Sequence, residues 1–153
     1  MKKRSVFIFG LVLAGAVFVG SNLYASEDVE RYEKSNHQKT LHALGIEAEP
    51  KDVERMNTLT DGNGKKWIYT DFIDRGTIIE KMDSKYTEDV GGAFIQVHDK
   101  IMQKYAKVGD TIPVILLDEE LKEGYFAFNR QEGETLSFKI KYDNGAWEYE
   151  LQK

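Results

Sequence analysis

The 153-residue chain contains no cysteine, and this absence excludes several classes of function. Thiol nucleophiles, cysteine-ligated zinc and redox-active dithiols all need that residue, and so does a lipid anchor attached through cysteine. A disulfide framework is excluded as well, although small exported domains usually depend on one. The fold must therefore be stabilised by packing alone, for which eight Tyr, eight Phe and two Trp supply apolar area.

Basic residues are in the minority. The chain has 21 Lys and Arg against 26 Asp and Glu, which gives a net charge of −5. Binding to nucleic acid or to an anionic membrane surface needs basic patches, so we expect neither partner. The excess of carboxylates favours solubility instead.

Long apolar runs are confined to one segment at the N-terminus. Met1–Arg4 is cationic, Ser5–Gly20 carries no charge, and the next five residues end in the small residue Ala25. This tripartite pattern is typical of a secretory signal peptide. We predict that residues 1–25 are cleaved after Ala25 and that residues 26–153 form one exported domain, secreted or extracytoplasmic, in a bacterial setting.

A retained membrane anchor is the alternative for this segment. A spanning helix needs about 20 predominantly apolar residues, whereas this run has sixteen residues and contains three glycines. Cleavage is favoured on those grounds. It would also remove Lys2, Lys3 and Arg4 and so change the net charge from −5 to −8.

Three segments have the pattern of helices. The first is Ser26–Leu44, which Gly45 is suited to end. A short helix is expected over Lys51–Leu59, because Pro50 is tolerated in a first turn. The most regular pattern covers Gly92–Lys107 and predicts a buried stripe. The stripe consists of Phe94, Val97, Ile101 and Tyr105.

Alternation of apolar and polar residues predicts strands around and after that helix. Asp143-Asn144-Gly145 is a strong hairpin signal between the last two of them. The predicted strands are Lys66–Ile73, Thr77–Met82, Thr111–Asp118, Gly124–Asn129, Thr135–Tyr142 and a final strand carrying Trp147, Tyr149 and Leu151.

These elements predict an α+β fold. N-terminal helices and one central helix should pack on a curved antiparallel sheet of about five to six strands. This element order resembles the cone-shaped fold of nuclear transport factor 2 and its relatives, in which a curved antiparallel sheet wraps around helices. Cystatin-like domains, with one helix cradled by a sheet, are the alternative resemblance.

His98 is the most interesting single residue. It falls beside Phe94 and Met102 on the apolar face of the predicted central helix. In a pocket, a histidine can act as an acid, a base or a ligand-orienting group. A buried histidine that is hydrogen-bonded within the core is the alternative. The predicted ligand-pocket residues are His98, Tyr105, Trp67, Tyr69 and Asp71.

Metal, cofactor and catalytic motifs are weak, and we predict neither a metal site nor a cofactor. Asp61–Lys65 resembles the start of a calcium loop, but Lys65 stands where a ligand oxygen is needed. His37 and His42 would lie about 140° apart around a helix and would not share a face. No serine lies in a Gly-x-Ser-x-Gly turn, and acidic pairs arise by chance in so acidic a chain.

Three hypotheses for function follow from these observations. The preferred one is an exported, non-enzymatic domain that binds an exported protein, a cell-envelope component or a small ligand. The second is a small pocket-type ligand-binding protein or enzyme that uses His98. The third is an inhibitor or immunity-type protein that acts on another exported enzyme. The partner-binding hypothesis predicts a contiguous exposed apolar patch.

Overall fold

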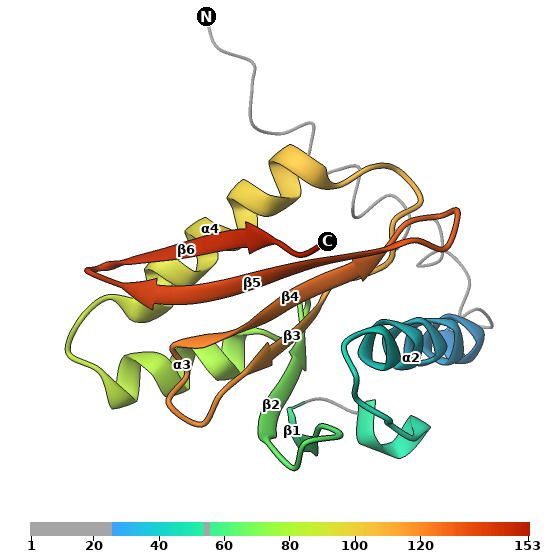
Figure 1. Ribbon diagram of the computed structural model, residues 1–153, viewed down its shortest axis with the longest axis horizontal. Coiled ribbons are helices and arrows are strands. Elements are labelled where there is room, and N and C mark those ends of the chain that lie inside the picture. The colour runs from blue at the N-terminus through green and yellow to red at the C-terminus, as the bar shows by residue number, and fades with distance from the viewer. Residues whose placement is uncertain (1–25, 54–55) are drawn as a thin grey trace, which may run out of the picture.

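Six strands form one open antiparallel sheet, in which each strand pairs with the next strand along the chain (Figure 1). The computed structural model describes residues 26–53 and 56–153, so the predicted signal peptide, residues 1–25, lies outside the described residues. The sheet order is β1-β2-β3-β4-β5-β6. Its strands are β1 (Asn57–Thr60), β2 (Lys66–Asp71), β3 (Val114–Leu117), β4 (Glu123–Asn129), β5 (Thr135–Asp143) and β6 (Ala146–Leu151).

Helices pack on both faces of this sheet. The first face is covered by α3 (Gly76–Lys85) and α4 (Val90–Tyr105), which are inserted between β2 and β3. The second face is partly covered by α2 (Ser26–Ala43) and the short 3-10 helix η1 (Pro50–Val53). In Figure 1, α4 runs beside β6 and α2 lies beside β3 and β4.

The larger part of the core lies between the first face and the two helices α3 and α4. Successive strand residues point to opposite faces, which places Ile115, Phe126 and Phe138 toward these helices. The helices contribute Ile78, Met82, Phe94, Val97 and Ile101, and each of these side chains is at most 1% exposed.

A smaller core lies on the second face. Leu41 of α2 and Ile46 from the loop after it pack on Trp67 of β2 and Leu116 of β3. Gly45 ends the turn after α2 with φ +80°, a left-handed conformation that glycine adopts without steric cost. The chain thus reverses there and brings Ile46 back onto the sheet.

The structure confirms the α+β class, the antiparallel sheet and the packing of helices on it. It does not confirm the specific order of the nuclear transport factor 2 or cystatin folds, because the strands follow one another as a simple meander. The hairpin signal is confirmed, since Asn144 and Gly145 have φ +48° and +84° between β5 and β6. Among the described residues, no helix is long and apolar enough to cross a membrane.

Two predicted elements were wrong. Thr77–Met82, predicted as a strand, lies within α3, where the four-residue spacing of Ile78 and Met82 places both side chains in the core. Lys51–Leu59, predicted as a helix, contains the end of η1 and most of β1. Pairing of β1 with β2 supplies backbone hydrogen bonds that override the weak helical signal of this segment.

Candidate functional site

The five residues predicted to line one pocket lie on both faces of the sheet. Trp67 and Tyr69 alternate onto the second face, below α2, and Asp71 ends the same strand. His98 and Tyr105 lie on α4, which packs on the first face. Because the sheet separates the two groups, they belong to two different sites.

His98 is enclosed by aromatic rings on the first face. Its side chain is 0% exposed, and its ring centroid lies 4.1 Å from that of Phe94 and 4.7 Å from that of Phe126. Neither Nδ1 nor Nε2 has a hydrogen-bond partner among the described residues. Burial, and to a smaller extent the Arg75 guanidinium, lowers the pKa of His98 well below its usual value. The imidazole is therefore neutral at neutral pH.

Two further buried polar atoms on the elements around His98 are unpaired. Thr70 Oγ1 of β2 and Asp99 Oδ1 of α4 have no hydrogen-bond partner within the part of the chain that the structure describes. Arg75 stacks its guanidinium 3.8 Å from the centre of the Phe72 ring and donates a hydrogen bond to the Phe72 carbonyl. Each unpaired buried polar group costs about 1–3 kcal/mol. Four of the five unpaired buried side-chain atoms among the described residues thus lie on β2 and α4, and the fifth is His37 Nε2 on the second face.

The second site joins α2 to the sheet through a buried polar pair. Tyr69 Oη and His37 Nδ1 share a hydrogen bond of 2.8 Å, and the two residues are 1% and 3% exposed. Burial lowers the pKa of His37, although the nearby Asp71 carboxylate opposes this effect. Burial, followed by Asp71 and other carboxylates, raises the pKa of Tyr69. Both groups are therefore neutral at neutral pH, and they link α2 to β2.

The other predicted residues have structural partners. Trp67 donates from Nε1 to Asp61 Oδ2 at 2.9 Å, and this hydrogen bond lowers the pKa of Asp61. The other Asp61 oxygen accepts from the backbone of Asn63 and Lys65, so the suspected calcium loop is a turn closed by its own carboxylate.

Tyr105 packs against the C-terminal hairpin. Its ring centroid lies 4.8 Å from that of Phe138 on β5 and 6.3 Å from that of Tyr149 on β6. These contacts place Tyr105 in the aromatic part of the first core. They give it the packing role that an aromatic residue on a helical apolar stripe usually has.

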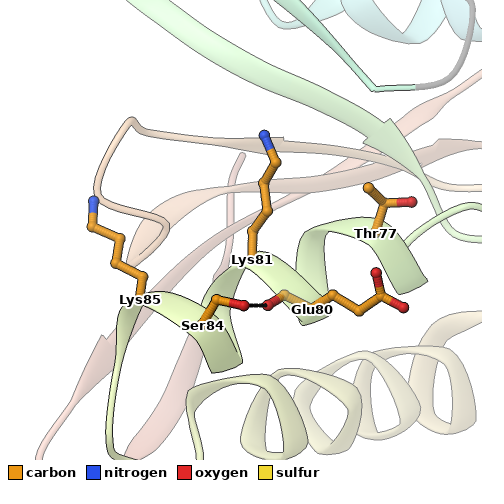
Figure 2. A pocket seen from close by; sticks show the side chains of 5 residues that line it. All are labelled: Thr77, Glu80, Lys81, Ser84 and Lys85. Atoms are coloured by element: carbon orange, nitrogen blue, oxygen red, sulfur yellow. Dashed lines mark hydrogen bonds between the residues drawn. The ribbon is translucent and has the colours of Figure 1, made fainter.

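A shallow, open depression lies along the outer side of α3 (Figure 2). All its lining residues come from that one helix, and Ser84 donates from Oγ to the Glu80 carbonyl at 2.7 Å. None of the predicted pocket residues lines it. The lining residues are Thr77, Glu80, Lys81, Ser84 and Lys85.

The last strand gives the sheet a free edge. β6 pairs with β5 on one side, and no strand among the described residues pairs with its other side. Glu148 and Glu150 are exposed on the second face, while Trp147 packs into the first core and Tyr149 packs against it. β6 is therefore an edge strand with one charged face and one aromatic face.

The sequence pattern does not reveal several of these features. It presents His37 only as a possible zinc ligand together with His42, and it does not single out the residues around His98 that carry unpaired atoms. The spacing of Asn36, His37, Thr40 and Leu41, all of which are buried, was the available signal for the docking face of α2. The orphaned atoms around His98 had no signal in the sequence, because they depend on the packing of β2 against α4.

Within residues 26–53 and 56–153, no group of three or more His, Asp or Glu side chains is arranged to hold a metal ion. Comparison of the chain with family models, with curated proteins and with solved structures found no match.

Proposed function

We propose that this chain is an exported, non-enzymatic domain that binds a partner protein by pairing an extended segment of that partner with the outer edge of β6. The observation that carries the proposal is the unpaired side of this six-residue strand at the end of an open sheet. A free edge presents a row of backbone N–H and C=O groups, and recognition by strand addition uses such a row.

The contiguous exposed apolar patch that the partner-binding hypothesis predicts is not found among the described residues, so the proposal rests on the strand edge instead. The large apolar residues that are exposed among the described residues lie apart along the chain and include a single member of β6. Scattered apolar residues of this kind need no partner to cover them. They are Ile73 (56% exposed), Ile95 (36%), Val108 (66%) and Leu151 (39%).

Burial of two of the three histidines supports binding rather than catalysis, and the exposed His42 shares a hydrogen bond with Glu47. His98 is 0% exposed and His37 is 3% exposed, so neither imidazole is within reach of a substrate outside the protein. An acid or base must lie within hydrogen-bond reach of the proton that it transfers. The side chains of the two glutamates on β6, by contrast, are exposed.

Photo-crosslinking in the cells that produce the protein tests this function. The full-length chain should carry benzoylphenylalanine in place of Glu148 in β6, and in a matched variant in place of the exposed Lys81 in α3. We expect position 148 to form one dominant adduct, with the crosslink in an extended segment of the partner, and position 81 to form none. Equal adducts from the two positions, or none from position 148, would contradict the proposal.

The identity of the crosslinked partner separates the classes of binding domain. An exported enzyme whose activity falls when this protein is added would make the chain an inhibitor or immunity-type protein. A cell-envelope component would make it an envelope-binding domain. Mass spectrometry of the adduct identifies the partner, and an activity assay of that partner decides between the two.

A small-ligand site around His98 is the second candidate function, because neither ring nitrogen of this buried side chain has a partner among the described residues. A ligand group or an ordered water at each nitrogen would satisfy them. Native mass spectrometry of the protein purified from its host should then show an adduct that is absent from a His98→Phe variant. A native mass equal to that of the polypeptide would eliminate a retained ligand.

A further inference from the structure

The two faces of β6 define the kind of segment that its outer edge accepts. Glu148 and Glu150 project to the second face, where both are exposed. Trp147 and Tyr149 alternate with them and pack toward the first core. A strand added beside β6 would continue both faces of the sheet, because directly opposed residues in a sheet point the same way.

β5 already shows which residues suit the charged face. It pairs with the inner edge of β6, and its register places Lys141 opposite Glu148 and Lys139 opposite Glu150. Opposite charges at facing positions stabilise a pair of strands. The sheet therefore uses alternate lysines to complement the two glutamates on the side that is occupied.

These lysines do not hold the glutamates in close ion pairs. Lys139 Nζ lies 3.1 Å from Glu123 Oε1 on β4, on the side of β5 away from β6. Within the described part of the chain, neither Glu148 nor Glu150 belongs to a salt bridge. Neither carboxylate is thus taken up by a salt bridge on the inner side, and both can face a strand on the outer edge.

Building on the function proposed above, we infer that the outer edge of β6 accepts a protein segment with Lys or Arg at alternate positions and apolar residues between them. The basic side chains would face Glu148 and Glu150 on the second face. The apolar ones would lie beside Tyr149 and the partly exposed Leu151 on the first face. Main-chain hydrogen bonds would hold the segment, and the alternating side chains would select it.

A second copy of this chain does not fit the same edge. Two β6 strands can pair antiparallel so that their charged faces lie on the same side of the sheet. In the two such registers with the greatest overlap, Glu148 lies opposite either Glu148 or Glu150 of the other copy. Parallel pairing in register sets each glutamate opposite its own equivalent. Like charges at facing positions destabilise strand pairing, so the occupant is a basic segment of another protein.

Peptide binding to the purified full-length chain tests this inference. The probe is a fluorescent synthetic peptide that copies residues 135–143, in which Lys139 and Lys141 alternate with apolar residues. The control peptide has glutamate at both lysine positions. We expect the lysine peptide to bind about tenfold more tightly, since two facing pairs change from opposite to like charge. Amide hydrogen exchange of residues 146–151 should slow when it binds.

Charge reversal in the protein supplies the converse test. A variant with Glu148→Lys and Glu150→Lys should prefer the glutamate peptide. The matched control is Glu132→Lys with Glu134→Lys, which makes the same change of net charge at two exposed positions in the loop between β4 and β5. This control should still prefer the lysine peptide, and an unfolding curve for each variant checks that it is folded.

The outcomes separate this inference from the proposed function. Equal affinity for the two peptides, with slowed exchange in β6, overturns the charge preference and leaves the edge as a binding site. If the loop control prefers the glutamate peptide, net charge alone selects the peptide. That result also overturns the inferred charge preference of the β6 edge. Failure of both peptides to bind, or binding without slowed exchange in β6, counts against the edge itself and therefore against both proposals.

Discussion

Gly124 of β4 sits where the backbone of β3 leaves no room for a side chain. A Cβ atom at this position would lie 1.8 Å from the carbonyl oxygen of Leu116, a backbone atom that cannot move without disturbing the pairing of the two strands. We therefore expect Gly124→Ala to lower the free energy of unfolding by about 2–4 kcal/mol. Chemical denaturation measures the change.

Gly76 provides the matched control for that substitution. It is the first residue of α3, and a Cβ atom there would meet nothing within 4 Å. Gly76→Ala should leave stability unchanged or raise it by up to about 1 kcal/mol, because alanine favours the helix. Equal losses in the two variants would show that close approach to β3 is not the cause at position 124.

His98 is a buried polar side chain whose replacement by an apolar ring should cost no stability. Its nitrogens have no hydrogen-bond partners among the described residues, and its ring lies among Phe94, Phe126 and Phe72. Replacing it with phenylalanine removes a desolvated polar group and leaves no other group orphaned by its loss. At pH 7.5 we expect His98→Phe to keep the free energy of unfolding unchanged or to raise it by up to about 2 kcal/mol.

The result also bears on the small-ligand hypothesis. One outcome is that denaturation curves show His98→Phe to be destabilised while His98→Gln keeps the stability of the unchanged chain. In that case the ring nitrogens must have a hydrogen-bond partner, to which the glutamine amide can bind in their place. Equal stability of the histidine and phenylalanine forms shows that packing alone explains the site. His98→Ala, which leaves a cavity, should lose about 2–4 kcal/mol in either case and confirms that the position is buried.

The sequence predicted the surroundings of His98 only in part. Helical spacing placed His98 on the apolar face of α4 with Phe94 and Tyr105, and all three positions pack on the first face. The separation of Trp67 and Tyr69 from His98 could not be predicted, because it depends on which face of β2 receives α4. Alternation along β2 gives two faces without saying which helix covers each.

At the scale of elements, regular periodicity predicted structure well and short segments did not. The helix expected over Gly92–Lys107 and the strands of the C-terminal half lie within a few residues of α4 and of β3 to β6. α3 was missed because its β-branched residues favour a strand locally, whereas the pairing of Ile78 with Met82 in the core makes a helix. β1 has only four residues, too few to show a period.

The described part of α2 docks through more polar than apolar side chains. Its buried side chains, among those described, are Asn36, His37, Thr40 and Leu41, of which only Leu41 is apolar. The hydrogen bond between Tyr69 and His37 is therefore one of the main contacts of this part of the helix. Such an element should open locally at lower free energy than the rest of the sheet.

Tyr69→Phe tests this account of α2. The substitution removes the hydroxyl and leaves the His37 ring without its partner, which should cost about 1–3 kcal/mol. We expect amide hydrogen exchange in residues 36–43 to accelerate more than exchange in α4. Tyr149→Phe is the control, because Tyr149 makes ring contacts and no side-chain hydrogen bond among the described residues. Uniform acceleration across the domain would contradict a local role for this hydrogen bond.

At the scale of the whole molecule, the two buried histidines on opposite faces of the sheet should make the free energy of unfolding decrease as the pH falls. Burial lowers the folded-state pKa of both His37 and His98, whereas an unfolded histidine titrates near its ordinary pKa of about 6.5. Below that pH the unfolded chain binds more protons than the folded one. Stability is therefore fully present above about pH 6.5 and is lost as the pH falls toward the folded-state values.

The expected loss has an upper limit of about 1.4 kcal/mol per pH unit for each histidine. Denaturation curves measured from pH 7.5 to pH 5 should show it, over a range that ends above the ordinary pKa of carboxylates. His98→Phe should remove the larger part, because His98 is the more deeply buried and its pKa lies well below the usual value. His37→Gln combined with His98→Phe should make the curve nearly flat. A double variant that keeps the slope of the unchanged chain would mean that neither buried histidine controls the response of the molecule to acid.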